Sequence, residues 1–115
     1  MIRILLVDDD ESNRLTMTAL LEDEGFDVEV AVSKADACAA LSVEPSFALV
    51  LTDQHLGDGL GSDIVPIVRD RMPEAKVVLM SGSAGDAPLS VVPDGCFTKG
   101  EDFGELLSLI RALCI

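Results

Sequence analysis

Aromatic residues are scarce in this 115-residue chain, which contains no Trp, no Tyr and only four Phe. Hydrophobic residues still make up 49% of the chain, so Leu, Val, Ile and Ala must build most of any core. A chain of this length buries one core, and we therefore expect one domain over residues 1–115.

Basic residues are also few, since 8 Lys and Arg stand against 21 Asp and Glu, for a formal net charge of -13. A nucleic-acid partner requires a basic surface, so the charge argues against direct binding of nucleic acid. The same acidity argues against contact with anionic membranes.

Paired cysteines and long apolar runs are absent as well. The three cysteines, Cys38, Cys96 and Cys114, are odd in number and show no Cys-x-x-Cys or Cys/His metal spacing. Free thiols in a reducing compartment are the simplest interpretation. No stretch is long and apolar enough to span a bilayer, and the first apolar run is too short for a signal peptide. We therefore predict a cytoplasmic protein.

Short apolar runs alternate along the chain with helical patterns. The expected strands cover 2–7, 27–31, 47–52, 76–80 and 95–98, and the expected helices cover 12–24, 34–43, 61–72 and 102–113. The intervening stretch 82–95 is rich in Gly and Pro, so it permits only a weak helical segment over 86–92. Strands without apolar–polar alternation are buried on both faces and hence parallel. The predicted fold is α/β, with a doubly wound five-stranded parallel sheet, helices on both faces and a short or irregular fourth helix.

Polar residues gather where these strands end. Asp8 and Asp9 follow the first strand, Asp53 the third, Ser81 the fourth and Lys99 the fifth. Open α/β sheets bind ligands at the carboxyl ends of their strands. In the strand order 2-1-3-4-5 the first and third strands are neighbours, and three crowded carboxylates favour a bound cation. Hard oxygen ligands favour Mg²⁺ or Mn²⁺.

Each residue also has a simpler interpretation. Asp8 and Asp9 can cap the following helix. Ser81 with the glycine after it can form an ordinary turn, and Lys99 can be one more surface lysine. Their common place at one edge of the sheet is what favours a site.

Four segments carry a resemblance to a known family. In order along the chain, these are LLVDDDESNR, LVLTDQHLGDGLG, VVLMSG and CFTKG. Together they resemble the receiver domain of response regulators in two-component signalling, and the resemblance covers the whole chain. It implies a five-stranded parallel sheet of order 2-1-3-4-5 with five helices. It also implies transfer of a phosphoryl group from a phosphohistidine, on a histidine kinase or a histidine phosphotransfer protein, to Asp53.

The resemblance further implies roles for the residues at this edge. Asp9, Asp53 and the backbone carbonyl of His55 would hold Mg²⁺, Asp8 would bind it through water, and Ser81 and Lys99 would engage the phosphoryl oxygens. The domain would then assist loss of the acyl phosphate to water. It would thus catalyse its own phosphorylation and dephosphorylation without turning over an external substrate.

The chain also departs from the family pattern. Gly100 stands where a Pro usually follows the lysine, and Gly57 replaces a common Pro. Cys96 occupies the position of the aromatic switch residue, and we expect Phe97 to point to the opposite face of its strand. These changes weaken the expected output surface. The Leu56–Gly59 loop resembles receivers of hybrid histidine kinases more than those of transcription factors.

Three other functions compete with the receiver interpretation. A haloacid-dehalogenase-type phosphatase needs a second aspartate two residues after the nucleophile, where this chain has His55. A flavodoxin-like flavin site needs a hydroxyl- and glycine-rich phosphate loop, where this chain has an acidic segment. A pseudo-receiver that acts only as an interaction module stays open, because the switch surface is altered. The partner kinase, the pathway and the oligomeric state are not determined by the sequence.

Overall fold

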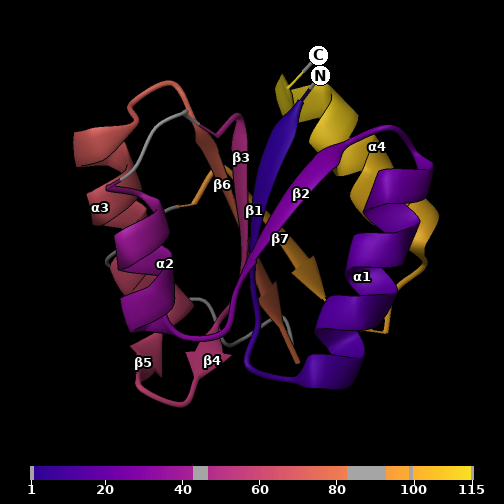
Figure 1. Ribbon diagram of the computed structural model, residues 1–115. Helices are drawn as coiled ribbons and strands as arrows, with labels where there is room; N and C mark the ends of the chain where they lie inside the picture. Colours follow the sequence, from indigo (N-terminus) through magenta and orange to yellow (C-terminus); the bar gives the residue numbers. More distant parts are fainter. Residues whose placement is uncertain (1, 43–46, 83–92, 99, 115) are drawn as a thin grey trace.

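The fold is a five-stranded parallel sheet between two layers of helices (Figure 1). The computed structural model describes residues 2–42, 47–82, 93–98 and 100–114. The strands are β1 (Arg3–Val7), β2 (Asp27–Ala31), β3 (Leu49–Asp53), β6 (Lys76–Ser81) and β7 (Gly95–Thr98). They lie in the order β2-β1-β3-β6-β7, and every neighbouring pair is parallel. This confirms the predicted order 2-1-3-4-5, counted over the strands of the main sheet.

Helices cover both faces of the sheet, as predicted. Helices α2 (Lys34–Ala40) and α3 (Ile64–Arg71) lie on one face, and α1 (Glu11–Asp23) and α4 (Phe103–Cys114) lie on the other (Figure 1). Each face has its own apolar cluster, because successive strand residues point to opposite sides. Leu5 and Val7 pack toward α2 and α3, while Ile4 and Leu6 pack toward α1 and α4. Each such buried side chain stabilises the fold by about 1.5–3 kcal/mol.

Local end signals explain where several helices begin and end. Asp10 caps α1, because its carboxylate accepts a hydrogen bond from the Asn13 amide at 3.0 Å. Gly25 follows α1 with a φ of 92°, a left-handed conformation that favours glycine. Asp102 accepts a hydrogen bond from the Gly104 amide at 3.1 Å in front of α4.

Some predicted boundaries were wrong. Helix α2 ends at Ala40 and not at residue 43, because the Leu41 amide makes a last helical bond to Ala37 and the Ser42 amide makes a turn-like bond to Ala39. The helix predicted over 61–72 starts as a 3₁₀ turn, η1 (Gly61–Asp63), before α3. Strand β3 begins at residue 49, two residues later than predicted, and includes Asp53. The weak helical segment expected over 86–92 lies outside the described residues.

A small antiparallel hairpin follows β3 and was not predicted. Its strands are β4 (His55–Leu56) and β5 (Gly59–Leu60). Gly57 and Asp58 form its turn. We refer to residues 54–63, which include this hairpin, as the acceptor loop.

The chain enters and leaves the fold at the amino edge of the sheet, where the parallel strands begin. Ala48 lies between the two ends, because its amide donates to the carbonyl of Arg3 at 2.9 Å and its own carbonyl accepts from the Cys114 thiol at 3.9 Å. The start of β1 and the end of α4 therefore lie together (Figure 1). Within the described residues, no helix is long and apolar enough to cross a membrane.

Candidate functional site

Three carboxylates meet at the carboxyl edge of the sheet. Asp8 and Asp9 follow β1, and Asp53 is the last residue of the neighbouring strand β3. One oxygen from each residue can be chosen so that all three lie within 4.8 Å of one another. Asp8 is fully buried, Asp53 is 6% exposed and Asp9 is exposed. We call Asp8, Asp9 and Asp53 the acidic triad.

The surroundings of Asp8 hold its carboxylate in a fixed position. Its Oδ1 accepts a hydrogen bond from the Asp10 amide at 2.9 Å, and its Oδ2 accepts one from Asn13 Nδ2 at 3.2 Å. Arg14 donates to the Asp8 backbone carbonyl at 3.0 Å. Asp10, and neither Asp8 nor Asp9, provides the capping side chain of α1. The simpler interpretation of the acidic pair as helix caps is therefore wrong.

Asp53 is held from behind by the acceptor loop. A Cβ atom at Gly61 would overlap the carbonyl oxygen of Asp53 and lie 3.1 Å from Thr52 Oγ1, so only glycine fits there without a shift. The Gly61 amide donates to the carbonyl of Gln54 at 2.8 Å. The buried Gln54 side chain in turn accepts from the Ser62 amide at 3.0 Å. These contacts fix the backbone of residues 53 and 54, and so the position from which the Asp53 side chain extends.

Ser81 and Lys99 were the other predicted members of the site. Ser81 ends β6 and is 8% exposed. Met80 pairs with Asp53 in register, so Ser81 lies one residue beyond Asp53 along the same edge. Thr98 of β7 pairs with Ser81 on its other side. Lys99, the next residue, lies outside the described residues, and its role stays a prediction.

His55 lies in β4, directly after Gln54, and its side chain is exposed. The predicted role of its backbone carbonyl as a metal ligand stays a prediction.

The acidic triad has the chemistry of a site for a hard divalent cation. Three carboxylates so close together repel one another, and a cation between them removes that repulsion. Carboxylate oxygens with one exposed member leave room for bound water, which suits Mg²⁺. The triad residues therefore fit the metal that the sequence predicted.

Comparisons with known proteins agree with this geometry. The family model for the response regulator receiver domain matches residues 4–111. The chain belongs to this family. The receiver domain is 37% identical, over 79 residues, to the photosynthetic apparatus regulatory protein RegA of Cereibacter sphaeroides, covering 69% of this chain and 42% of RegA. It is 42% identical over 82 residues to a putative NtrX-like response regulator of Rickettsia conorii, covering 69% of this chain and 17% of that protein. It thus spans less than half of either relative.

Solved structures share the fold over almost the whole receiver domain. A response regulator receiver protein from Sinorhizobium medicae has a TM-score of 0.90 and 28% identity, over 98% of this chain and 94% of that one. The response regulator TrrA of Thermotoga maritima, solved in complex with Mg²⁺-BeF, has a TM-score of 0.86 and 24% identity, over 98% of this chain and 99% of that one. The second likeness shows the fold alone.

An apolar hollow of about 220 Å³ lies next to the acidic triad of the receiver domain. Its walls come from α1, β7 and the start of α4, and they include Asn13, Met17, Leu20, Phe97 and Phe103. Asn13 also donates to Asp8, so the hollow adjoins the triad directly. Phe97 is buried here and the neighbouring Cys96 is exposed, which confirms the expected opposite orientation.

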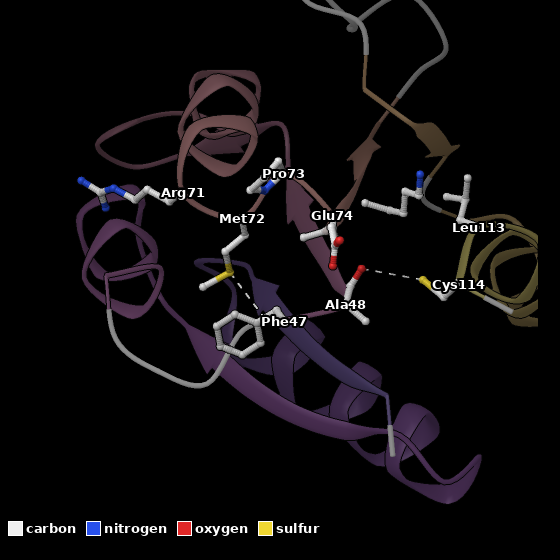
Figure 2. A pocket seen from close by; sticks show the side chains of 10 residues that line it. Phe47, Ala48, Arg71, Met72, Pro73, Glu74, Leu113 and Cys114 are labelled. Carbon is white, nitrogen blue, oxygen red and sulfur yellow. Dashed lines mark hydrogen bonds between the residues drawn. The ribbon is translucent and has the colours of Figure 1, made fainter.

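A larger hollow of about 550 Å³ opens at the amino edge, far from the triad (Figure 2). Its lining includes Phe47, Met72, Leu113 and Cys114. Figure 2 shows the Phe47 amide donating to the Met72 sulfur, at 3.5 Å, and the Cys114 thiol pointing to Ala48. Burial raises the pKa of Cys114 above its ordinary value.

Sequence reasoning missed the contacts of three residues at the site or on the acceptor loop: Asn13, Gln54 and Asp58. Asn13 and Gln54 make side-chain contacts five and eight residues away, and each looks like an ordinary polar residue in its own segment. Asp58 precedes a glycine, so its sequence signals only a turn. Its partners, the amides of Lys34 and Ala35, lie 24 and 23 residues away. No local pattern could have identified that contact.

Proposed function

We propose that Asp53 accepts a phosphoryl group from a phosphohistidine on a histidine kinase or a histidine phosphotransfer protein. The observation that carries this proposal is the grouping of Asp8, Asp9 and Asp53, from two neighbouring strand ends, within 4.8 Å. Ser81 lies farther along the same edge, where a hydroxyl can donate to a phosphoryl oxygen.

The transfer forms one bond and breaks another. A carboxylate oxygen of Asp53 forms a bond to phosphorus, while the P–N bond to the donor imidazole breaks and the ring nitrogen keeps the electron pair. The product is an acyl phosphate on Asp53. The signal ends by hydrolysis. Water adds to the phosphorus of the acyl phosphate, the P–O bond to Asp53 breaks, and inorganic phosphate leaves. Reactions of this kind depend on positioning and charge neutralisation more than on covalent help from the protein.

Asp9 and Asp53, with the backbone carbonyl of His55, would hold Mg²⁺, and Asp8 would bind it through water. The metal would neutralise charge on the phosphoryl oxygens and on the triad. The support for this assignment is the grouping of the three carboxylates within 4.8 Å and the oxygen-donor chemistry that Mg²⁺ prefers. Asn13 and the Asp10 amide orient Asp8, and the Gly61 and Gln54 contacts orient Asp53. Lys99 would engage a phosphoryl oxygen as the nearby cation.

The donor protein would dock over the apolar hollow beside the triad. Met17, Leu20 and Phe103 offer apolar surface next to the acceptor, and the acidic chain favours a donor with basic residues around its histidine. A cytoplasmic location, as expected from the sequence, belongs to this proposal. So does a place in a hybrid histidine kinase, which the Leu56–Gly59 loop favours.

The test is the intact mass of the protein after incubation with a small acyl-phosphate donor, with and without Mg²⁺. We expect the mass of one phosphoryl group to be added only with Mg²⁺, and not to Asp53→Asn. A folded protein that never gains this mass would favour the pseudo-receiver, an interaction module without phosphorylation. Stable phosphoryl label at position 53 of Asp53→Asn would overturn the choice of acceptor.

A further inference from the structure

The start of helix α2 lies against the acceptor loop through the carboxylate of Asp58. Asp58 Oδ1 accepts a hydrogen bond from the Lys34 amide at 2.8 Å, and Oδ2 accepts one from the Ala35 amide at 3.0 Å. These are the first two amides of α2, which have no carbonyl partner inside the helix. A residue of the acceptor loop thus completes the amino end of another element.

The caps of α2 itself leave those two amides to Asp58. Ser33 Oγ accepts from the Asp36 amide at 3.0 Å, and Asp36 Oδ2 accepts from the Val32 amide at 3.1 Å. This pair resembles a capping box, with Asp36 reaching the amide of Val32. Ser33 and Asp36 therefore serve α2 without touching the acceptor loop, whereas Asp58 joins the two.

Lys34 adds a second connection between the same elements. Its Nζ lies 3.5 Å from Asp63 Oδ2, at the far end of the acceptor loop. Its side chain crosses Gly59 so closely that a Cβ at that glycine would be 2.8 Å from Lys34 Cδ. The hairpin of β4 and β5 is thus held on α2 at its turn, along β5 and just after β5.

The position of this hairpin matters for the acidic triad. A Cβ at Gly57 would lie 3.9 Å from Asp9 Oδ2, so the hairpin turn runs beside the exposed member of the triad. Glycine at 57 gives the backbone more freedom than most residues would. The hydrogen bonds from α2 to Asp58, the residue after Gly57, restrict this backbone freedom. Asp58 is an exposed residue, and the hydrogen bonds from the two amides, followed by the Lys34 charge, lower its pKa below the ordinary value.

We propose that Asp58 is a positioning residue for the metal and phosphoryl site, holding the acceptor loop on α2 so that the His55 backbone stays beside the acidic triad. This inference rests on the proposed function, because it assumes that Mg²⁺ binds at the triad. Asp58 touches neither the metal nor the phosphoryl group. It acts through the backbone of residues 55–57.

The experiment measures two quantities: Mg²⁺ affinity by calorimetry and the rate of phosphorylation by a small acyl phosphate. It compares four proteins, namely wild type, Asp58→Ala, Asp58→Asn and Asp36→Ala. Removal of such supporting contacts weakens metal binding by roughly tenfold, and we expect this for Asp58→Ala. Asp58→Asn keeps one carbonyl oxygen as an acceptor, so it should recover part of the affinity and also serves if Asp58→Ala does not fold. Asp36→Ala removes a cap from the same helix end without freeing the loop, so its Mg²⁺ affinity should match that of wild type.

Two outcomes overturn the positioning role while leaving the proposed function intact. One is wild-type Mg²⁺ affinity in both Asp58 variants. The other is an equal loss in Asp36→Ala, which would assign the effect to α2 stability alone. A wild-type protein that binds no Mg²⁺ overturns the proposed function, and whether Asp58 holds the loop is then tested without metal. Amide exchange at residues 55–61 in the metal-free proteins then separates the cases, because a loop held by Asp58 exchanges faster in Asp58→Ala even without metal.

Discussion

At the carboxyl edge of the sheet, β1 and β3 end in carboxylates, whereas at the amino edge the strands begin around an aromatic ring, a thioether and a thiol. The carboxyl edge contains Asp8, Asp53 and Ser81, all buried. The amino edge contains Phe47, Met72 and Cys114 around its hollow (Figure 2). Crowded carboxylates cost stability, and packed apolar side chains supply it. The fold therefore keeps its proposed chemistry and part of its packing at opposite ends of shared strands.

The largest expected effect is the loss of phosphorylation on changing one residue of the carboxyl edge. Asp53→Asn should reduce phosphorylation by a small acyl phosphate to background, because the amide is not a nucleophile at phosphorus. The circular dichroism spectrum should not change, since Asn has nearly the same shape. Met72→Ala, at the opposite edge, should be phosphorylated at the wild-type rate. A slow variant there would show that the two edges are coupled.

The reverse effect is expected for stability. Met72 is 8% exposed and accepts the Phe47 amide, so Met72→Ala should lower the free energy of unfolding by about 2–4 kcal/mol. Urea denaturation followed by circular dichroism measures this, which suits a chain without Trp or Tyr. A loss well under 1 kcal/mol would mean that the hollow collapses readily around the smaller side chain.

Two glycines of the acceptor loop sharpen the comparison within the carboxyl edge. At Gly61 a Cβ would overlap the backbone of Asp53, whereas at Gly57 its nearest neighbour would be Asp9 Oδ2 at 3.9 Å. Gly61→Ala should cost about 1–3 kcal/mol of stability and slow phosphorylation, because the backbone of the acceptor must move. Gly57→Ala should fold with nearly wild-type stability. Equal melting temperatures for the two variants would contradict this description of the loop.

A smaller effect concerns two thiols, Cys96 of β7 and Cys114 of α4. Burial raises the pKa of Cys114, whereas Cys96 on β7 is exposed. Since the thiolate is the reactive form and Cys114 is partly buried, iodoacetamide at neutral pH should modify Cys96 faster than Cys114. Peptide mass mapping over time measures both rates in one sample. Unfolding in urea should make the rates similar, and similar rates in the native protein would contradict the packing at the amino edge.

The smallest expected effect is the acid dependence of Asp58. Its pKa in the folded protein lies below the ordinary 3.8, so its bonds to α2 stabilise the fold above that pH. This contribution is lost as the pH falls through the folded-state pKa. The stability difference between wild type and Asp58→Asn should therefore be constant near neutral pH and shrink below about pH 3.8. Asp70→Asn, at an exposed position of α3, controls for the loss of one charge.

The sequence predicted the strands and the residues at their ends, but it did not predict side-chain contacts between separate elements. The apolar runs around Leu5 and Val50 indicated buried parallel strands, and the ends of those runs placed Asp8 and Asp53 at one edge of the sheet. The β4–β5 hairpin was missed because its strands have two residues each. Asp58 was missed because its partners lie on another element. Helix ends shifted where turn-like hydrogen bonds replaced the helical pattern.

The meeting of β1 and α4 around Ala48 has a consequence for how the domain can be joined to other sequences. Arg3 and Cys114 both bond to Ala48, so the path into the fold and the path out of it lie side by side at the amino edge. Polypeptide fused to either end would depart from there and leave the acidic triad open to a docking protein. The domain can thus be inserted within a longer chain, tethered to a surface or tagged at both ends with its proposed acceptor still facing outward.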